Sequence, residues 1–243
     1  MKPWKEDEHP RDADGKFTKT STITAHKQLE AYGVNADALP DEWKPLLSKD
    51  IGADTQKKYR ELGSGIETNR YFDNAEQWQW ENGLTEQQKE AIREYTNNEY
   101  STINKYLRWG DDITEKIRSG HLPAIEAALS SYVLREPIKV YRSIDSTVFV
   151  WNKDVSELKG KIFHDDAFVS ATPTLDSEAL TQDTVLIINI PSGKGRGAYI
   201  NNLSVYKNQE YEFLIQRGCN FRITKAYKKE NYIIEMEMIT LDG

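Results

Sequence analysis

The hydrophobic positions change their spacing near Pro137. Before that point apolar residues recur every three or four positions, which is typical of amphipathic helices. After it they alternate with polar residues or form short runs, which is typical of β-strands. The segments that predict strands are IKVYRSI, DAFVSAT, TVLIINI, GAYIN, EYEFLIQ, CNFRITKAY and NYIIEMEMIT. Helices followed by a run of strands with hairpin-length gaps predict an α+β fold.

Three helices have clear sequence signals. Thr85 and Gln88 match a capping box, so a helix should begin after Thr85 and run to about Thr96. The segment EYSTINKYLRWG continues helically and places one amide within an apolar stripe, which consists of Tyr100, Ile103, Asn104 and Leu107. A third helix is predicted over about residues 123–134. The amide in the stripe is either a satisfied core group or part of a site.

The N-terminal third divides into two predicted regions. Residues 1–21 are charged, rich in turn formers and poor in aliphatic residues, which indicates a flexible tail. Residues 22–80 contain short amphipathic pieces, including TAHKQLEAYG, DEWKPLLSKD and TQKKYRELG, and predict a small helical extension. The principal domain is then predicted over residues 81–243.

Composition narrows the class of protein. The 243-residue chain has a formal net charge of −7, which argues against a broad basic surface for nucleic acid. The single cysteine, Cys219, excludes an intramolecular disulfide framework and a multi-cysteine metal site, and we expect no metal. The sequence shows no signal-peptide pattern and no membrane-length apolar run, so we expect synthesis in a cytoplasm. It also lacks the Rossmann and Walker phosphate-binding motifs.

The segment YKNQEYEFLIQRG places two glutamates, Glu210 and Glu212, on one face of a predicted strand. Neighbouring like charges disfavour each other and Glu is uncommon in strands, so the plain explanation is a solvated edge strand. Other strands also carry polar residues that an inert sheet does not require. Arg142 lies within IKVYRSI, where it needs an anionic partner or forms a structural salt bridge. Ser170 and Thr172 place two hydroxyls on one face of FVSAT.

The order of these residues resembles the R–S-T-S–E-x-E pattern of the mono-ADP-ribosyltransferase toxins, the branch with the C3-like exoenzymes and the enzymatic components of actin-modifying binary toxins. The resemblance extends to AIREYTNNEYSTINKYLR, AIEAALSS, PIKVYRS and GAYINNLSVYKNQEYEFLIQRGCNFRI, which together cover about residues 84–240. It implies N-terminal helices packed on a mixed, mainly antiparallel two-sheet β core. The hydroxyl motif departs from the family pattern because Ala171 occupies its middle position.

The resemblance implies that NAD+ is the substrate and gives these residues roles. Glu212 would stabilise positive charge on the ribose and hold its 2′-hydroxyl, and Ser170 would orient Glu212. Arg142 would pair with the pyrophosphate, since a guanidinium fork suits phosphate oxygens. Further cofactor-binding residues implied by the resemblance are Tyr95, Tyr100, Asn104 and Thr172.

The same resemblance implies how the acceptor is bound. Glu210 would hold the incoming nucleophile, and in this family Glu at that position accompanies arginine acceptors while Gln accompanies asparagine acceptors. Tyr206 would belong to the target-recognition turn. The implied function is transfer of ADP-ribose to a protein arginine, with release of nicotinamide.

Two alternatives stay open. The same site could hydrolyse NAD+ as a glycohydrolase. The chain could also be an inactive interaction protein of a phage head, because HPRDADGKFT resembles linker sequence in phage head-associated proteins. The resemblance leaves the target protein unidentified, and delivery by a translocation component or with a virion is equally open.

Overall fold

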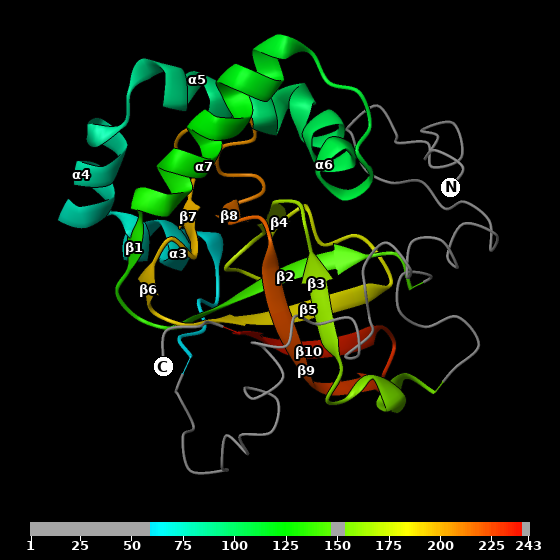
Figure 1. Ribbon diagram of the computed structural model, residues 1–243. Helices are drawn as coiled ribbons and strands as arrows, with labels where there is room; N and C mark the ends of the chain where they lie inside the picture. Colours follow the sequence, from blue (N-terminus) through cyan, green and yellow to red (C-terminus); the bar gives the residue numbers. More distant parts are fainter. Residues whose placement is uncertain (1–58, 147–153, 240–243) are drawn as a thin grey trace.

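The computed structural model describes residues 59–146 and 154–239 and confirms the α+β class (Figure 1). Helices come first in the described part. They are α3 (Gly65–Phe72), α4 (Ala75–Gly83), α5 (Glu86–Glu94), the π-helical segment η3 (Tyr95–Glu99), α6 (Tyr100–Trp109), the π-helical segment η4 (Lys116–His121) and α7 (Leu122–Ser131). Within these ranges, every helix is too short or too polar to cross a membrane.

The strands form two main sheets and a short ribbon. The five-stranded sheet has the order β2 (Ile138–Ile144), β5 (Thr184–Ile190), β10 (Tyr232–Ile239), β9 (Cys219–Lys228) and β3 (Ile162–Asp165). The antiparallel three-stranded sheet has the order β4 (Val169–Ala171), β8 (Phe213–Ile215) and β7 (Gly197–Tyr199). The ribbon pairs β1 (Val133–Leu134) with β6 (Gly193–Lys194), and a 3₁₀ turn, η6 (Val155–Leu158), precedes β3. Strands β5 and β10 are parallel and the other neighbours antiparallel, so the mixed, mainly antiparallel two-sheet core is confirmed.

Alternating side chains explain why the sheets bury one face. Strand β5 buries every second residue from Thr184 to Ile190, and β10 does the same from Ile234 to Met238. Helix α7 contributes Ile125 and Leu129, both fully buried, to the same hydrophobic core. In Figure 1, helices α5 to α7 lie at the top, the three-stranded sheet lies below them, and the five-stranded sheet lies at the bottom.

For the helices that begin near Thr85 and Pro123, the predicted first residues agree with the structure better than the predicted last residues. Thr85 forms the expected capping box, because its side chain accepts from the Gln88 backbone while the Gln88 side chain accepts from the Thr85 backbone at 2.9 Å. The third helix ends at Ser131 and not near residue 134. Tyr132 is already extended, with ψ of 141°, and the next two residues pair with β6.

The helix predicted over TQKKYRELG is wrong where the structure describes it. Residues 59–63 are not helical, and Arg60 forms a parallel bridge with Ile138. The Arg60 backbone N–H donates to the Pro137 carbonyl at 2.8 Å, and its carbonyl accepts from the Lys139 N–H at 2.9 Å. The segment therefore lies beside β2, where backbone pairing outweighs helical propensity. The predicted tail and the pieces TAHKQLEAYG and DEWKPLLSKD lie outside the described residues.

Helices α3 and α4 share the core of the sheets. The Phe72 ring stacks on Tyr199 of β7 with centroids 4.1 Å apart, and Gln77 Nε2 donates to the Tyr199 carbonyl at 2.8 Å. Residues before position 81 therefore hold the edge of the three-stranded sheet. The division of the chain into a tail, an extension and a principal domain stays a prediction.

Candidate active site

Two strands from different sheets bring Arg142 beside Ser170. Tyr141 of β2 and Thr172, just after β4, exchange two backbone hydrogen bonds of 2.7 and 2.8 Å, which join the sheets at this point. The neighbouring residue Arg142 then donates from Nη1 to the Ser170 carbonyl at 2.6 Å. No carboxylate among the described residues forms an ion pair with Arg142, so the structural salt bridge considered from the sequence is not seen there. A half-buried guanidinium of this kind can receive an anion.

Glu212 is buried beside this pair. Strand β8 pairs with β4 in a register that puts Leu214 opposite Ser170, and Glu212 precedes that strand with a relative exposure of 5%. Burial, with the charge of Glu210 as the next cause, raises the pKa of Glu212 from its ordinary 4.5 to about 8. A hydrogen bond from Ser170 and the charge of Arg142 act in the opposite direction. The solvated-edge explanation is therefore wrong for Glu212.

The helix wall of the site is formed by Tyr95 and Asn104. Tyr95 is fully buried at the start of η3, and Asn104 Nδ2 donates to its hydroxyl at 3.0 Å. In an uninterrupted α-helix, residues nine apart lie about two and a half turns apart on opposite faces. The π-helical segment rotates the following residues about the helix axis, so that Asn104 lies on the same side as Tyr95. Such π-bulges are frequent at functional sites. Burial raises the pKa of Tyr95 to about 12, with the Glu212 charge as the next cause, while hydrogen bonds with the Asn104 and Ser170 side chains lower it.

One acceptor in this wall has no partner. The Oδ1 atom of Asn104 is buried and makes no hydrogen bond within the described residues. A buried polar atom without a partner is costly, and it often indicates a bound ligand or water. A ribose hydroxyl would satisfy this acceptor. The wall, Arg142 and Glu212 thus offer an amide, a cation and a carboxylate, which could contact a hydroxyl, an anion and a developing positive charge.

The predicted strand over EYEFLIQ is wrong for its first three residues. Strand β8 begins at Phe213, and residues 201–210 form a series of turns. Tyr211, between the two glutamates, has a φ of 51°, a left-handed conformation that breaks the two-residue period. Glu210 and Glu212 are therefore not held one pleat apart. Their charges still interact, and Glu210 is half-buried at the end of the turn.

The other predicted residues lie around this cluster. Thr172 is buried, and its hydroxyl accepts from the Thr174 backbone at 3.5 Å, so it supports the loop after β4. Tyr100 is half-buried on α6 and packs against the hydrophobic core. Tyr206 lies half-buried in the turn, and its backbone N–H donates to Ser204 Oγ at 3.1 Å. Their predicted roles toward a ligand or target stay predictions.

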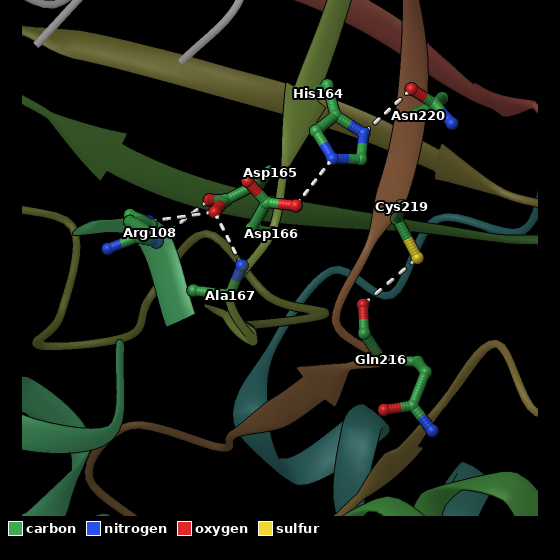
Figure 2. A network of polar contacts seen from close by, with 8 residues as sticks. All are labelled: Arg108, His164, Asp165, Asp166, Ala167, Gln216, Cys219 and Asn220. Carbon is green, nitrogen blue, oxygen red and sulfur yellow. Dashed lines mark hydrogen bonds and ion pairs between the residues drawn. The ribbon is translucent and has the colours of Figure 1, made fainter. Parts of the chain in front are cut away.

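A buried ion pair that the sequence interpretation missed joins α6 to β3 (Figure 2). Arg108 donates to both carboxylate oxygens of Asp165 at 2.8 Å, and the Ala167 backbone N–H donates to the same carboxylate at 2.9 Å. The Asp165 side chain is 3% exposed and that of Arg108 is 10% exposed. Because Arg108 follows Asn104 by one helical turn, both lie on one face of α6. The pair therefore fixes α6 above the connection that leads into Ser170.

Figure 2 also shows the polar groups beside this pair. His164 contacts Asn220 through Nδ1 at 2.8 Å and Asp166 through Nε2 at 2.9 Å. The Cys219 thiol donates to the Gln216 carbonyl at 3.0 Å, and burial, with Asp165 as the next cause, raises the pKa of this thiol to about 12. A thiol with so high a pKa is a poor nucleophile. Across the described residues, no group of three or more His, Cys, Asp or Glu side chains could hold a metal ion.

Comparison with known proteins places this geometry in context. A family model described as "ADP-ribosyltransferase exoenzyme" matches residues 69–241. The NAD(+)–arginine ADP-ribosyltransferase EFV of Enterococcus faecalis is 26% identical over 157 residues, which cover 59% of this chain and 30% of that protein. The match thus spans less than a third of this curated relative.

Solved structures share the fold. The C3 exoenzyme of Clostridium limosum aligns with a TM-score of 0.65 and 19% identity, covering 75% of this chain and 98% of that one. C3stau2 from S. aureus, solved with NAD, aligns with a TM-score of 0.63 and 20% identity over 75% and 99% of the two chains. BECa, an ADP-ribosylating toxin of a C. perfringens binary enterotoxin, was solved with NADH. It aligns with a TM-score of 0.63 and 23% identity, covering 74% of this chain and 50% of that one.

Proposed function

Because the chain belongs to the ADP-ribosyltransferase exoenzyme family, whose model matches residues 69–241, we propose that it transfers ADP-ribose from NAD+ to an arginine of a target protein. The observation that carries the proposal is the buried Glu212 among Ser170, Tyr95 and Arg142. A carboxylate placed out of water suits the positive charge that develops on ribose as nicotinamide leaves.

The buried groups of this chain divide the work of breaking the nicotinamide–ribose bond. The Glu212 carboxylate opposes the positive charge of the sugar, and Ser170 donates to that carboxylate and keeps it oriented. Arg142 binds pyrophosphate oxygens with the guanidinium donors that it does not give to Ser170. Asn104 accepts a hydrogen bond from a ribose hydroxyl through its unpartnered Oδ1. The positive charge on the nicotinamide ring of NAD+ favours the ionised form of Glu212 once the substrate is bound.

The proposal of an arginine acceptor rests on Glu210 and on the relative from Enterococcus faecalis, whose name states arginine specificity. Glu210 lies in the turn, more exposed than Glu212, where a target side chain can reach it. A carboxylate there would hold a guanidinium and help to accept its proton. Hydrolysis of NAD+ needs the buried groups but no guanidinium clamp, so Glu210 should separate the two reactions.

The test is to map the modified residue. The protein is incubated with NAD+ labelled on its adenylate part and with bacterial and eukaryotic lysates, and labelled proteins are digested and sequenced by mass spectrometry. We expect ADP-ribose on arginine, released by neutral hydroxylamine. Glu210→Gln should lower this labelling by about 10²-fold, comparable to loss of one preorganised charged contact, and spare most NAD+ hydrolysis. An adduct on asparagine or cysteine would contradict the arginine assignment.

A further inference from the structure

The turn that carries Glu210 is too long for strand pairing to fix its shape. It leaves β7 at Tyr199 and returns to β8 at Phe213, whereas antiparallel neighbours are usually joined by loops of about two to five residues. Asn208, two residues before Glu210, has a φ of 62°, and Tyr211, the residue after it, has a φ of 51°. Such angles are uncommon for non-glycine residues, although asparagine adopts them more readily than an aromatic residue such as Tyr211 does, and surrounding contacts usually stabilise them.

The first set of enforcing contacts is a network of three asparagines. Asn69 Nδ2 and Asn201 Nδ2 donate to Asn208 Oδ1 at 2.9 and 3.1 Å. The Asn208 backbone N–H donates to Asn201 Oδ1 at 2.8 Å. The Tyr199 hydroxyl and Asn201 Nδ2 donate to Asn69 Oδ1 at 2.7 and 3.2 Å. Asn69, on α3, thus connects both ends of the turn.

The second set holds the other side of Glu210. The Tyr211 ring lies against Gly65 so closely that a methyl group at Gly65 would collide with it. The Gly65 backbone N–H donates to the Asp176 carboxylate at 2.9 and 3.0 Å, and Ser177 Oγ donates to the Glu210 carbonyl at 2.9 Å. The loop after β4 is therefore tied to α3 and to Glu210 at once.

Both sets of contacts start from one face of α3. Gly65 and Asn69 are four residues apart, so they lie one above the other on the helix surface. We propose that Asn69 and Asn208 are positioning residues, which hold the Glu210 carboxylate where an acceptor guanidinium meets the sugar of NAD+. This inference rests on the proposed function. It gives α3 a role in binding the acceptor, separate from the buried groups proposed to break the nicotinamide–ribose bond.

The test compares Asn69→Ala and Asn208→Gly with the control Asn74→Ala. Glycine tolerates the φ of Asn208, so Asn208→Gly removes the amide without adding backbone strain. Asn74 caps α4 through bonds to the Glu76 and Gln77 backbones, so its loss costs stability without touching the network. Each protein receives NAD+ and agmatine, a small guanidine, and transfer and NAD+ hydrolysis are measured on the same samples.

We expect both network variants to lose about tenfold to a hundredfold in transfer, because small misplacements of a reacting group have effects of that size. Hydrolysis should stay within about threefold of the control, since it does not use Glu210. Transfer equal to that of Asn74→Ala, or an equal loss of transfer and hydrolysis, would overturn the positioning role.

Hydrogen exchange decides the inference independently of activity. Backbone amides over residues 201–210 should exchange at least about tenfold faster in Asn69→Ala than in wild type, because the turn loses its fixed conformation. Unchanged exchange would overturn the proposal. If the wild-type protein itself neither transfers ADP-ribose nor hydrolyses NAD+, accelerated exchange in Asn69→Ala would support the anchoring and contradict only the proposed function.

Discussion

Glu212 is held in a state that costs the folded protein stability. Its pKa in the folded protein, about 8, lies above the ordinary 4.5 because burial disfavours its charge. Below pH 4.5 the carboxyl group is neutral in both folded and unfolded chains. Between pH 4.5 and about pH 8 the folded chain binds a proton that the unfolded chain does not, so the free energy of unfolding falls as pH rises. Such a cost at a single residue is typical of a functional carboxylate.

Glu212→Gln should therefore stabilise the protein at alkaline pH and have little effect near pH 4.5. Each unit of pKa difference corresponds to about 1.4 kcal/mol, so the gain at high pH should reach a few kcal/mol. Urea denaturation of both proteins across this pH range measures the difference. If the variant is less stable than wild type at high pH, burial of the charged Glu212 does not lower the stability of the folded protein.

Arg142 should be required for NAD+ to stabilise the fold. A ligand that binds only the native state stabilises it by about 2.7 kcal/mol at a hundred times its Kd, which raises the melting temperature. Arg142→Ala should remove most of this rise by leaving the pyrophosphate without its cation. Arg135→Ala serves as the control, because Arg135 forms an exposed ion pair with Glu76. An NAD+-induced rise that survives in Arg142→Ala would exclude Arg142 from the site.

Pairs of structural elements, and not single strands, build the site. The β2–β4 bridge places Arg142, the β4–β8 register places Glu212, and the π-helical segment places Tyr95 beside Asn104. The Arg108–Asp165 pair then holds α6 over the turn between β3 and β4. Apart from the Tyr95–Asn104 contact, which lies within one helical stretch, these contacts join segments that are separated in sequence, so they depend on the tertiary fold.

Breaking the Arg108–Asp165 pair should be costly. Asp165→Ala removes the carboxylate that accepts two hydrogen bonds from the buried Arg108 guanidinium, and the expected loss is about 3–5 kcal/mol of unfolding free energy. Glu126→Ala, which removes the partner of the more exposed Arg217, should cost about 0–1 kcal/mol. Urea denaturation at one pH compares the two. Equal losses would mean that the buried pair does not anchor α6.

Regular strands could be predicted from the sequence, but the turn over residues 201–210 could not. Strands β2 and β5 match their predicted segments, because an apolar pattern bounded by turn residues determines both. The segment before β8 also alternates, yet Tyr211 is left-handed there. The Tyr211 ring packs against Gly65, about 140 residues earlier in the chain, and no local pattern reports such a contact. Arg108 and Asp165 were missed for the same reason.

At the level of the whole molecule, the family match begins within α3 and covers the helices that follow it and both main sheets. The buried groups that we propose break the nicotinamide–ribose bond lie where the two sheets meet α6. Glu210 lies on a separate turn that α3 anchors. This separation predicts that acceptor use and bond cleavage can be changed independently.

The release of nicotinamide from NAD+ tests the central claim most directly. Wild-type protein and Glu212→Gln are incubated with NAD+ and free nicotinamide is measured over time, with the far-ultraviolet circular dichroism of both proteins as the control for folding. We predict release by wild type and a rate lower by about 10²–10³-fold in the variant, the loss expected for one preorganised electrostatic group. Release by a folded Glu212→Gln within a few-fold of wild type would contradict the assignment of Glu212 as the catalytic carboxylate.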